Sequence, residues 1–123
     1  MSHGEPLPAP KSFESVRDVI AGMPSAFDAA AAGDLVATIQ FDITDEDPGD
    51  YHVTIENRTC KAFAGTHPDP TATIHTPADV WLQIVRGELN AANAFMSRQF
   101  TTSGDMGLLM RMTALFGARP EET

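Results

Sequence analysis

The residue types that most often perform catalysis are sparse in this chain of 123 residues. Cys60 is the only cysteine, and the neighbouring Lys61 would point to the opposite face of a predicted strand. No serine stands in the Gly-x-Ser-x-Gly pattern of a hydrolase nucleophile, and most serines occupy predicted helix starts. These patterns favour a structural cysteine, and they predict no catalytic residue and no enzymatic activity.

Metal-binding and phosphate-binding patterns are also missing from the sequence. The histidines have neither His-x-His nor His-x-x-x-His spacing. The acidic stretch from Asp42 to Asp50 places Gly49 at the fifth position counted from Asp45, where a calcium loop needs a ligand. The Gly-Asp-Met-Gly stretch that begins at Gly104 lacks the Lys and Ser/Thr of a nucleotide-binding loop. We therefore expect a solvated acidic turn, no metal site and no cofactor.

Net charge and apolar content restrict the partners of the chain. Eight Lys and Arg against 17 Asp and Glu give a net charge of −9, which disfavours nucleic acid and anionic membrane surfaces. No apolar run approaches the roughly 20 residues of a membrane span, and the N-terminal residues do not resemble a secretory signal. A single cysteine excludes an internal disulfide. We expect a cytoplasmic chain without stable membrane insertion.

Apolar side chains gather in the last third of the sequence. Four of the six methionines lie between Met96 and Met112, together with Phe95, Phe100 and Leu109. Methionine is flexible and polarizable, and it lines surfaces that adapt to variable apolar partners. The cluster permits two interpretations: a helix that simply packs on a sheet, or a gap between helix and sheet that accepts an alkyl chain or a ring system.

The elements that position this cluster follow from its periodicity. Apolar residues three and four positions apart predict a first helix that Pro24 closes, and an alanine-rich stretch predicts a short second helix over 27–32. Alternation of apolar and polar residues then predicts several short strands. These strands cover 36–43, 51–56, 60–65 and 71–75.

A second group of helices follows the strands. Thr76 as N-cap, Pro77 at the first helical position and Gly87 after the end predict a helix over 77–86. Further segments follow: a helix over 91–97, a strand over 100–102 and one final helix from Ser103 to Phe116. Strands joined by short turns pair mostly antiparallel. The order of elements predicts an α+β fold with helices covering one face of a single sheet.

The spacing of several motifs resembles the sterol carrier protein 2 family. The residues that carry the resemblance are Trp81 and Gly87, the Ala94-Phe95-Met96-Ser97 stretch, Gly104-Asp105-Met106 and Leu115-Phe116. The resemblance covers about residues 12–117, so we expect one lipid-binding domain there, a flexible N-terminal arm over 1–11 and a polar tail over 118–123. The tail differs from a peroxisomal address of the Ser-Lys-Leu type. A tail without this address is typical of a free-standing bacterial member.

The resemblance implies a five-stranded, mostly antiparallel sheet with an apolar tunnel between sheet and helices. It implies non-catalytic binding of a fatty acid, a fatty acyl-CoA or a sterol-like lipid. By position it gives eight candidate lining residues: Trp81, Phe95, Met96, Phe100, Met106, Leu109, Met110 and Met112. Arg86, Arg98 and Arg111 lie near these positions, either as a cationic mouth for a lipid head group or as solvated surface residues.

Two hypotheses about function therefore remain open at this point. In the first, the chain binds or transfers an apolar lipid in the tunnel. In the second, the chain is an accessory or dimerisation module, and the same apolar face binds another protein chain, including a second copy of itself.

Overall fold

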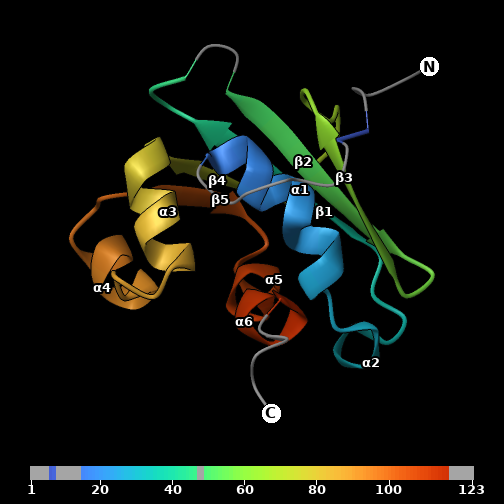
Figure 1. Cartoon of the computed structure of the whole chain (residues 1–123). Coiled ribbons are helices and arrows are strands. Elements are labelled where there is room, and N and C mark those ends of the chain that lie inside the picture. Colours follow the sequence, from blue (N-terminus) through green and yellow to red (C-terminus); the bar gives the residue numbers. More distant parts are fainter. Residues whose placement is uncertain (1–5, 8–14, 47–48, 117–123) are drawn as a thin grey trace.

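A five-stranded sheet forms the centre of the computed structural model, which describes residues 6–7, 15–46 and 49–116 (Figure 1). The strand order across the sheet is β3-β2-β1-β4-β5. The strands are β1 (Ala37–Ile43), β2 (Asp50–Glu56), β3 (Thr59–Ala64), β4 (Ala72–Thr76) and β5 (Thr101–Gly104). Neighbours pair antiparallel except β1 and β4, which run parallel. The predicted α+β class and mostly antiparallel sheet are confirmed.

The parallel pair arises because β3 and β4 are not neighbours. The β2–β3 connection is a tight two-residue turn in which Asn57 and Arg58 have φ values of 54° and 59°, as a type I′ hairpin turn requires. After β3 the chain crosses to the other side of β1 through residues 65–71, and β4 then runs parallel to β1.

The two faces of the sheet differ in polarity. Ile39 and Phe41 on β1 and Val53 on β2 are fully buried on the face that the helices cover. Alternate positions on the opposite face carry Gln40 and His52, which are buried but polar. Figure 1 shows α1, α3 and α5 on one side of the sheet. The prediction that helices cover one face agrees with this arrangement.

Six helices complete the described residues. They are α1 (Val16–Ala26), α2 (Ala29–Ala32), α3 (Ala78–Val85), α4 (Ala91–Met96), α5 (Met106–Met110) and α6 (Met112–Phe116). Ser15 caps α1 by accepting a hydrogen bond from the Asp18 backbone N–H at 3.1 Å. None of the described helices is both long and apolar enough to cross a membrane.

Three details of the predicted helices are wrong. Pro24 lies inside the last turn of α1 instead of closing it. The predicted final helix begins at Met106, because Ser103 still belongs to β5, and it is divided at Arg111 into α5 and α6. Thr76 does not cap α3, because its hydroxyl donates to the Pro77 carbonyl, while Asp45 from the β1–β2 turn accepts from the Ala78 N–H at 2.9 Å.

The predicted tail over 118–123 lies outside the described residues, as does most of the predicted arm over 1–11. Within the arm, Pro6 and Leu7 are described. The Leu7 N–H donates to the Ala62 carbonyl at 3.0 Å, so these two residues lie along the free edge of β3.

Candidate functional site

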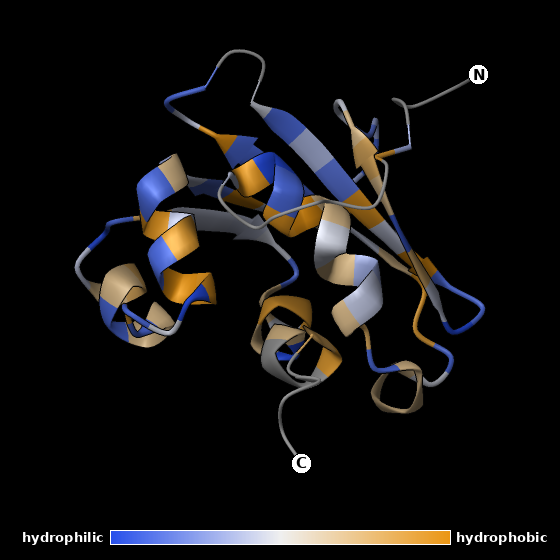
Figure 2. Ribbon diagram, viewed as in Figure 1, coloured by the Kyte–Doolittle hydropathy of each residue, from blue (hydrophilic) through white to orange (hydrophobic). Residues whose placement is uncertain are grey.

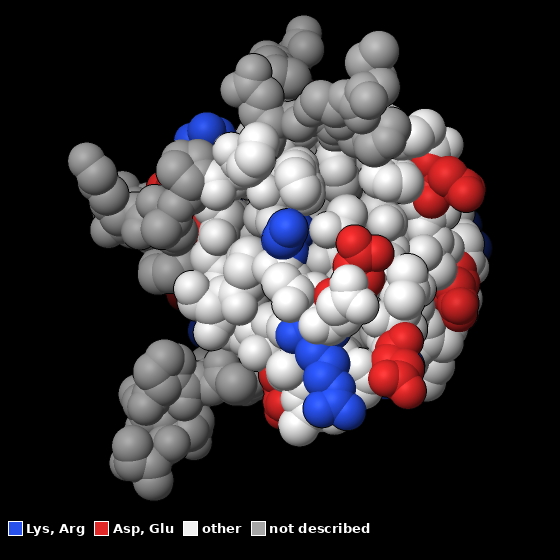
Figure 3. All heavy atoms as spheres, turned by 90° about the vertical axis from the view of Figure 1, so that its right-hand side faces the viewer, with Lys and Arg blue, Asp and Glu red and all other residues white. Residues whose placement is uncertain are grey.

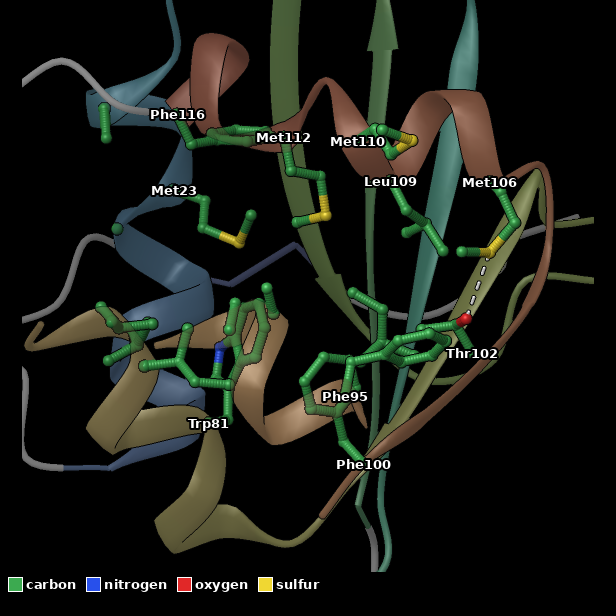
Figure 4. Close-up of a pocket in the computed structure, with 18 residues that line it drawn as sticks. Met23, Trp81, Phe95, Phe100, Thr102, Met106, Leu109, Met110, Met112 and Phe116 are labelled. Atoms are coloured by element: carbon green, nitrogen blue, oxygen red, sulfur yellow. Dashed lines mark hydrogen bonds between the residues drawn. The ribbon is translucent and has the colours of Figure 1, made fainter. Parts of the chain in front are cut away.

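A cavity of about 550 Å³ lies between the sheet and the helices, within the size range of about 300–1,000 Å³ that is typical of small-molecule sites (Figure 4). We call it the helix–sheet cavity. Figure 2 shows hydrophobic segments in α1, α3 and α5, the helices around it. Its lining residues are Val19, Gly22, Met23, Ala26, Ile74, Trp81, Ile84, Val85, Ala91, Ala92, Phe95, Phe100, Thr102, Met106, Leu109, Met110, Met112 and Phe116.

The helix–sheet cavity extends from the core to the surface. Ile74 on β4 and Trp81 on α3 are buried at its inner end. Phe95, Met106 and Met110 are exposed at its outer end, with 42%, 45% and 80% of their surface accessible. A ligand can therefore enter from solvent and place its apolar part against the core.

Seven of the eight sequence-predicted residues line the helix–sheet cavity, and Met96 does not. Met96 is 79% exposed at the end of α4. Ala94 is the fully buried residue of this six-residue helix, so the helix turns Met96 toward solvent. The structure brings the other seven residues together from α3 to α6, and their part in lipid binding stays a prediction.

One wall of the helix–sheet cavity was missed by the sequence analysis. Val19, Gly22, Met23 and Ala26 of α1 line it, and Figure 4 shows Met23 directed toward Trp81. The spacing of Val19 and Met23 is that of any buried helix stripe. The sequence carries no signal that separates such a core stripe from a cavity wall.

Among the described residues, the wall contains two side chains with polar hydrogens and no charged side chain. The Thr102 hydroxyl donates to the Met106 sulfur at 3.3 Å (Figure 4). Trp81 packs against Phe41 with ring centroids 5.2 Å apart, and its Nε1 has no hydrogen-bond partner among the described residues. The site can therefore hold an apolar ligand by contact and desolvation, with few polar constraints.

The three arginines near the predicted site do not line the helix–sheet cavity. Arg86 and Arg98 are exposed at the ends of α3 and α4. The Arg111 guanidinium donates to the Ala31 carbonyl at 3.1 Å, so this side chain joins the α5–α6 junction to α2. A cationic mouth remains a sequence-based expectation.

Other polar and reactive groups in the described part of the chain also lie outside the helix–sheet cavity. Burial raises the pKa of the Cys60 thiol to about 12, which keeps it protonated and unreactive. His75 and Asp42 form a half-exposed pair across β4 and β1, with Nδ1 and Oδ2 3.0 Å apart. Residues 6–7, 15–46 and 49–116 contain no group of three or more potential metal ligands.

The fold and the cavity define a helix-on-sheet α+β domain with an internal apolar site. Residues 19–117 match the SCP-2 sterol transfer family, so the chain belongs to that family. The resemblance inferred from the sequence is thereby confirmed. The family is one of lipid binding or transfer, and its domains are in general not catalysts.

Several solved structures share the fold. The stereoselective inverting sec-alkylsulfatase Pisa1 from Pseudomonas sp. aligns with a TM-score of 0.71 and 17% identity over 80% of this chain. The chain spans only 16% of that enzyme. Palmitated SCP2L2 from Aedes aegypti aligns with a TM-score of 0.65 and 19% identity, over 81% of this chain and 92% of that one.

A ubiquinone synthesis protein, UbiJ-SCP2, aligns with a TM-score of 0.58 and 15% identity, over 76% of each chain. No curated protein matches the sequence. At these identities the structural neighbours establish the fold alone.

Proposed function

We propose that the chain binds an apolar lipid in the helix–sheet cavity and carries or presents it without changing it chemically. The observation that carries this proposal is a cavity with an apolar wall that runs from buried Trp81 to exposed Met110. Burial of apolar ligand surface against such a wall gives about 25 cal/mol per Å² before the costs of association. Fatty acids, fatty acyl-CoA and sterol-like molecules are the candidate ligands.

The extent and the location of the unit are part of the proposal. One lipid-binding domain over residues 12–117 includes all the cavity-lining residues, and the family match over 19–117 supports these bounds. A single cysteine is consistent with a reducing, cytoplasmic compartment.

A pair of methionines provides a matched test of the site. Met112 lines the helix–sheet cavity and is half-buried, whereas Met96 lies outside it. Met112→Trp adds a rigid bulky ring to the wall, so we expect it to lower the affinity for a fluorescent fatty acid about tenfold. Met96→Trp makes the same chemical change at a surface position and is expected to bind like the unmodified chain.

The ligand itself can be sought directly. Organic extraction of the purified chain followed by mass spectrometry should recover bound lipid in an unmodified form. Repeated absence of lipid, together with no displacement of the fluorescent fatty acid, would exclude the proposal. Incubation of the chain with the recovered lipid should yield no product, and a product would contradict the non-catalytic role.

A second candidate function is an accessory module that binds another protein chain. The observation that favours it is the exposure of Met96, Met110 and Val85, which are large apolar side chains at the C-terminal ends of α4, α5 and α3. Scattered exposed apolar residues are common, but several in one region are typical of interaction sites. Sedimentation at low concentration of the unmodified chain and of Met110→Lys tests the homodimer. If both sediment as monomers, self-association is excluded.

A further inference from the structure

Trp81 contains the unpaired polar group in the wall of the helix–sheet cavity. The side chain is 8% exposed, and its Nε1 is fully covered, with no hydrogen-bond partner among the described residues. Buried N–H donors in folded proteins are normally paired, and an unpaired donor is destabilising. The Thr102 hydroxyl proton is already directed to the Met106 sulfur, so Trp81 is the wall's one free donor in the described part of the chain.

The rest of the wall determines what can supply the missing acceptor. None of the lining residues that the structure describes is charged, so a carboxylate or phosphate buried in the cavity would lose its hydration without an ion-pair partner. A neutral oxygen has a far smaller desolvation cost and satisfies one N–H donor. The chemistry of the wall thus suits a ligand with an accepting oxygen and no charge in its buried part.

We propose that the helix–sheet cavity selects a neutral lipid that carries a carbonyl or equivalent accepting oxygen, and that the Trp81 Nε1–H donates a hydrogen bond to this oxygen. The proposal rests on the proposed lipid-binding function and narrows its ligand class. A carboxylate is disfavoured at the buried end beside Trp81, although it can stay hydrated at the outer end. Ketones, esters, ethers and quinone-type carbonyls are favoured at the buried end.

The geometry requires a local rearrangement on binding. Figure 4 shows the indole nitrogen on the edge of Trp81 that is turned away from Phe95, with Met23 above the ring. Because Nε1 has no accessible surface, the indole or the side chains over it must shift when an acceptor arrives. Met23 and Met112 line the same cavity, and the flexibility of methionine makes such a shift easy.

The native chain contains its own reporter for this hydrogen bond. Trp81 is the only tryptophan, so a ¹⁵N-labelled sample gives a single indole N–H signal. The probes are methyl nonyl ketone and undecane, which have the same chain length and differ by a carbonyl in place of one methylene. Both are delivered from cyclodextrin. We expect the ketone to move the indole proton downfield and undecane to leave its hydrogen-bonding state unchanged.

A variant then measures how much affinity the hydrogen bond contributes. The unmodified chain should prefer the ketone over undecane by about three- to tenfold after correction for partition from cyclodextrin, as expected for one neutral hydrogen bond. Trp81→Phe should abolish this preference. Met96→Leu, an apolar change outside the cavity, should retain it, and undecane should still bind to Trp81→Phe, so general damage to the cavity is distinguished from loss of the donor.

The outcomes separate this inference from the proposed function. Equal binding of ketone and undecane without a shift of the indole proton would overturn the inference and leave lipid binding intact. Tighter binding of undecanoate than of the ketone would also overturn it. Failure of both neutral probes and of the fluorescent fatty acid to bind would overturn the proposed function itself.

Discussion

Gly104 connects the edge strand β5 to α5, and few residues other than glycine could adopt its backbone conformation. Its φ is +91°, and an added Cβ would lie 2.5 Å from the Thr71 carbonyl oxygen and 2.8 Å from the Ala72 Cα. The same Thr71 carbonyl accepts the Asp105 N–H at 3.0 Å, so the close approach aligns the N-terminus of α5. A side chain here would push a wall of the helix–sheet cavity away from β4.

We predict that Gly104→Ala lowers the free energy of unfolding by about 1–3 kcal/mol from backbone strain, and by more from the clash. Gly87→Ala is the matched control. Gly87 also has a positive φ, +79°, but its Cβ would meet no atom within 4 Å. Urea denaturation of both variants checks the prediction, and equal losses would show that the close approach to Thr71 is unimportant.

Cys60 shows how burial determines reactivity at a single residue. The residue is 7% exposed, and burial raises the pKa of its thiol from 9.0 to about 12. At pH 8 this shift reduces the thiolate fraction about a thousandfold relative to an unfolded chain. We predict that maleimide labels the native chain at least about a hundredfold more slowly than the chain in urea, and similar rates would contradict the burial of Cys60.

The same shift predicts a loss of stability at alkaline pH. The pKa of Cys60 is higher in the folded state than in the unfolded state. Its contribution to the free energy of unfolding is therefore fully present below pH 9 and is lost as the pH rises toward about 12. Burial also raises the pKa of Tyr51, which adds a loss of the same sign. Denaturation across this range should therefore give a flatter pH profile for Cys60→Ala than for the unmodified chain.

At the scale of elements, α5 and α6 are five residues each, too short to be stable without tertiary packing. Leu108 of α5 and Leu115 of α6 are buried and attach these helices to the core. The neighbouring Leu109 is half-buried and lines the helix–sheet cavity. Adjacent leucines of one helix thus have different roles.

We predict that Leu108→Ala lowers the free energy of unfolding by about 2–5 kcal/mol because it leaves a cavity in the core. Leu109→Ala should cost about 1 kcal/mol, since only part of its surface is buried. It should instead change the affinity for the fluorescent fatty acid. Denaturation and displacement measured on both variants check this division, and equal stability losses would contradict it.

The strands and most helix bounds are predictable because they depend on local patterns. The helix-start signal at Thr76 and Pro77 predicts a helix over 77–86, and α3 spans Ala78–Val85. The break at Arg111 depends instead on distant contacts. The Arg111 side chain binds the Ala31 carbonyl, and Phe116 packs on Phe27 with centroids 5.7 Å apart, so α6 turns toward α2. No local pattern encodes these partners.

The candidate site was half predictable for the same reason. Methionines and aromatics at Phe95, Met106 and Met110 are unusual enough in the sequence to indicate an adaptable apolar surface. Met23 of α1 has the spacing of an ordinary core residue, and only the folded arrangement places it opposite Trp81. The unpaired Nε1 of Trp81 cannot be predicted either, because pairing depends on every neighbour in three dimensions.

For the whole molecule, charge and apolar surface are separated. The net charge is −9, yet the described part of the chain contributes no charged residue to the lining of the helix–sheet cavity. Figure 3 shows one face of the molecule, and several acidic groups lie along one border of it. A carrier with this distribution approaches an anionic membrane against long-range repulsion, although its exposed apolar residues would gain from contact with lipid.

We therefore predict that lipid transfer from anionic vesicles becomes faster as salt is added. The Debye length falls from about 30 Å at 0.01 M to about 10 Å at 0.1 M, so repulsion between chain and vesicle is progressively screened. Transfer from vesicles of neutral lipid is the control and should change little over the same range. Dequenching of a fluorescent lipid in stopped flow measures both rates. Slower transfer from anionic vesicles in salt would mean that the exposed Arg86 or Arg98 attracts the membrane locally and outweighs the net charge.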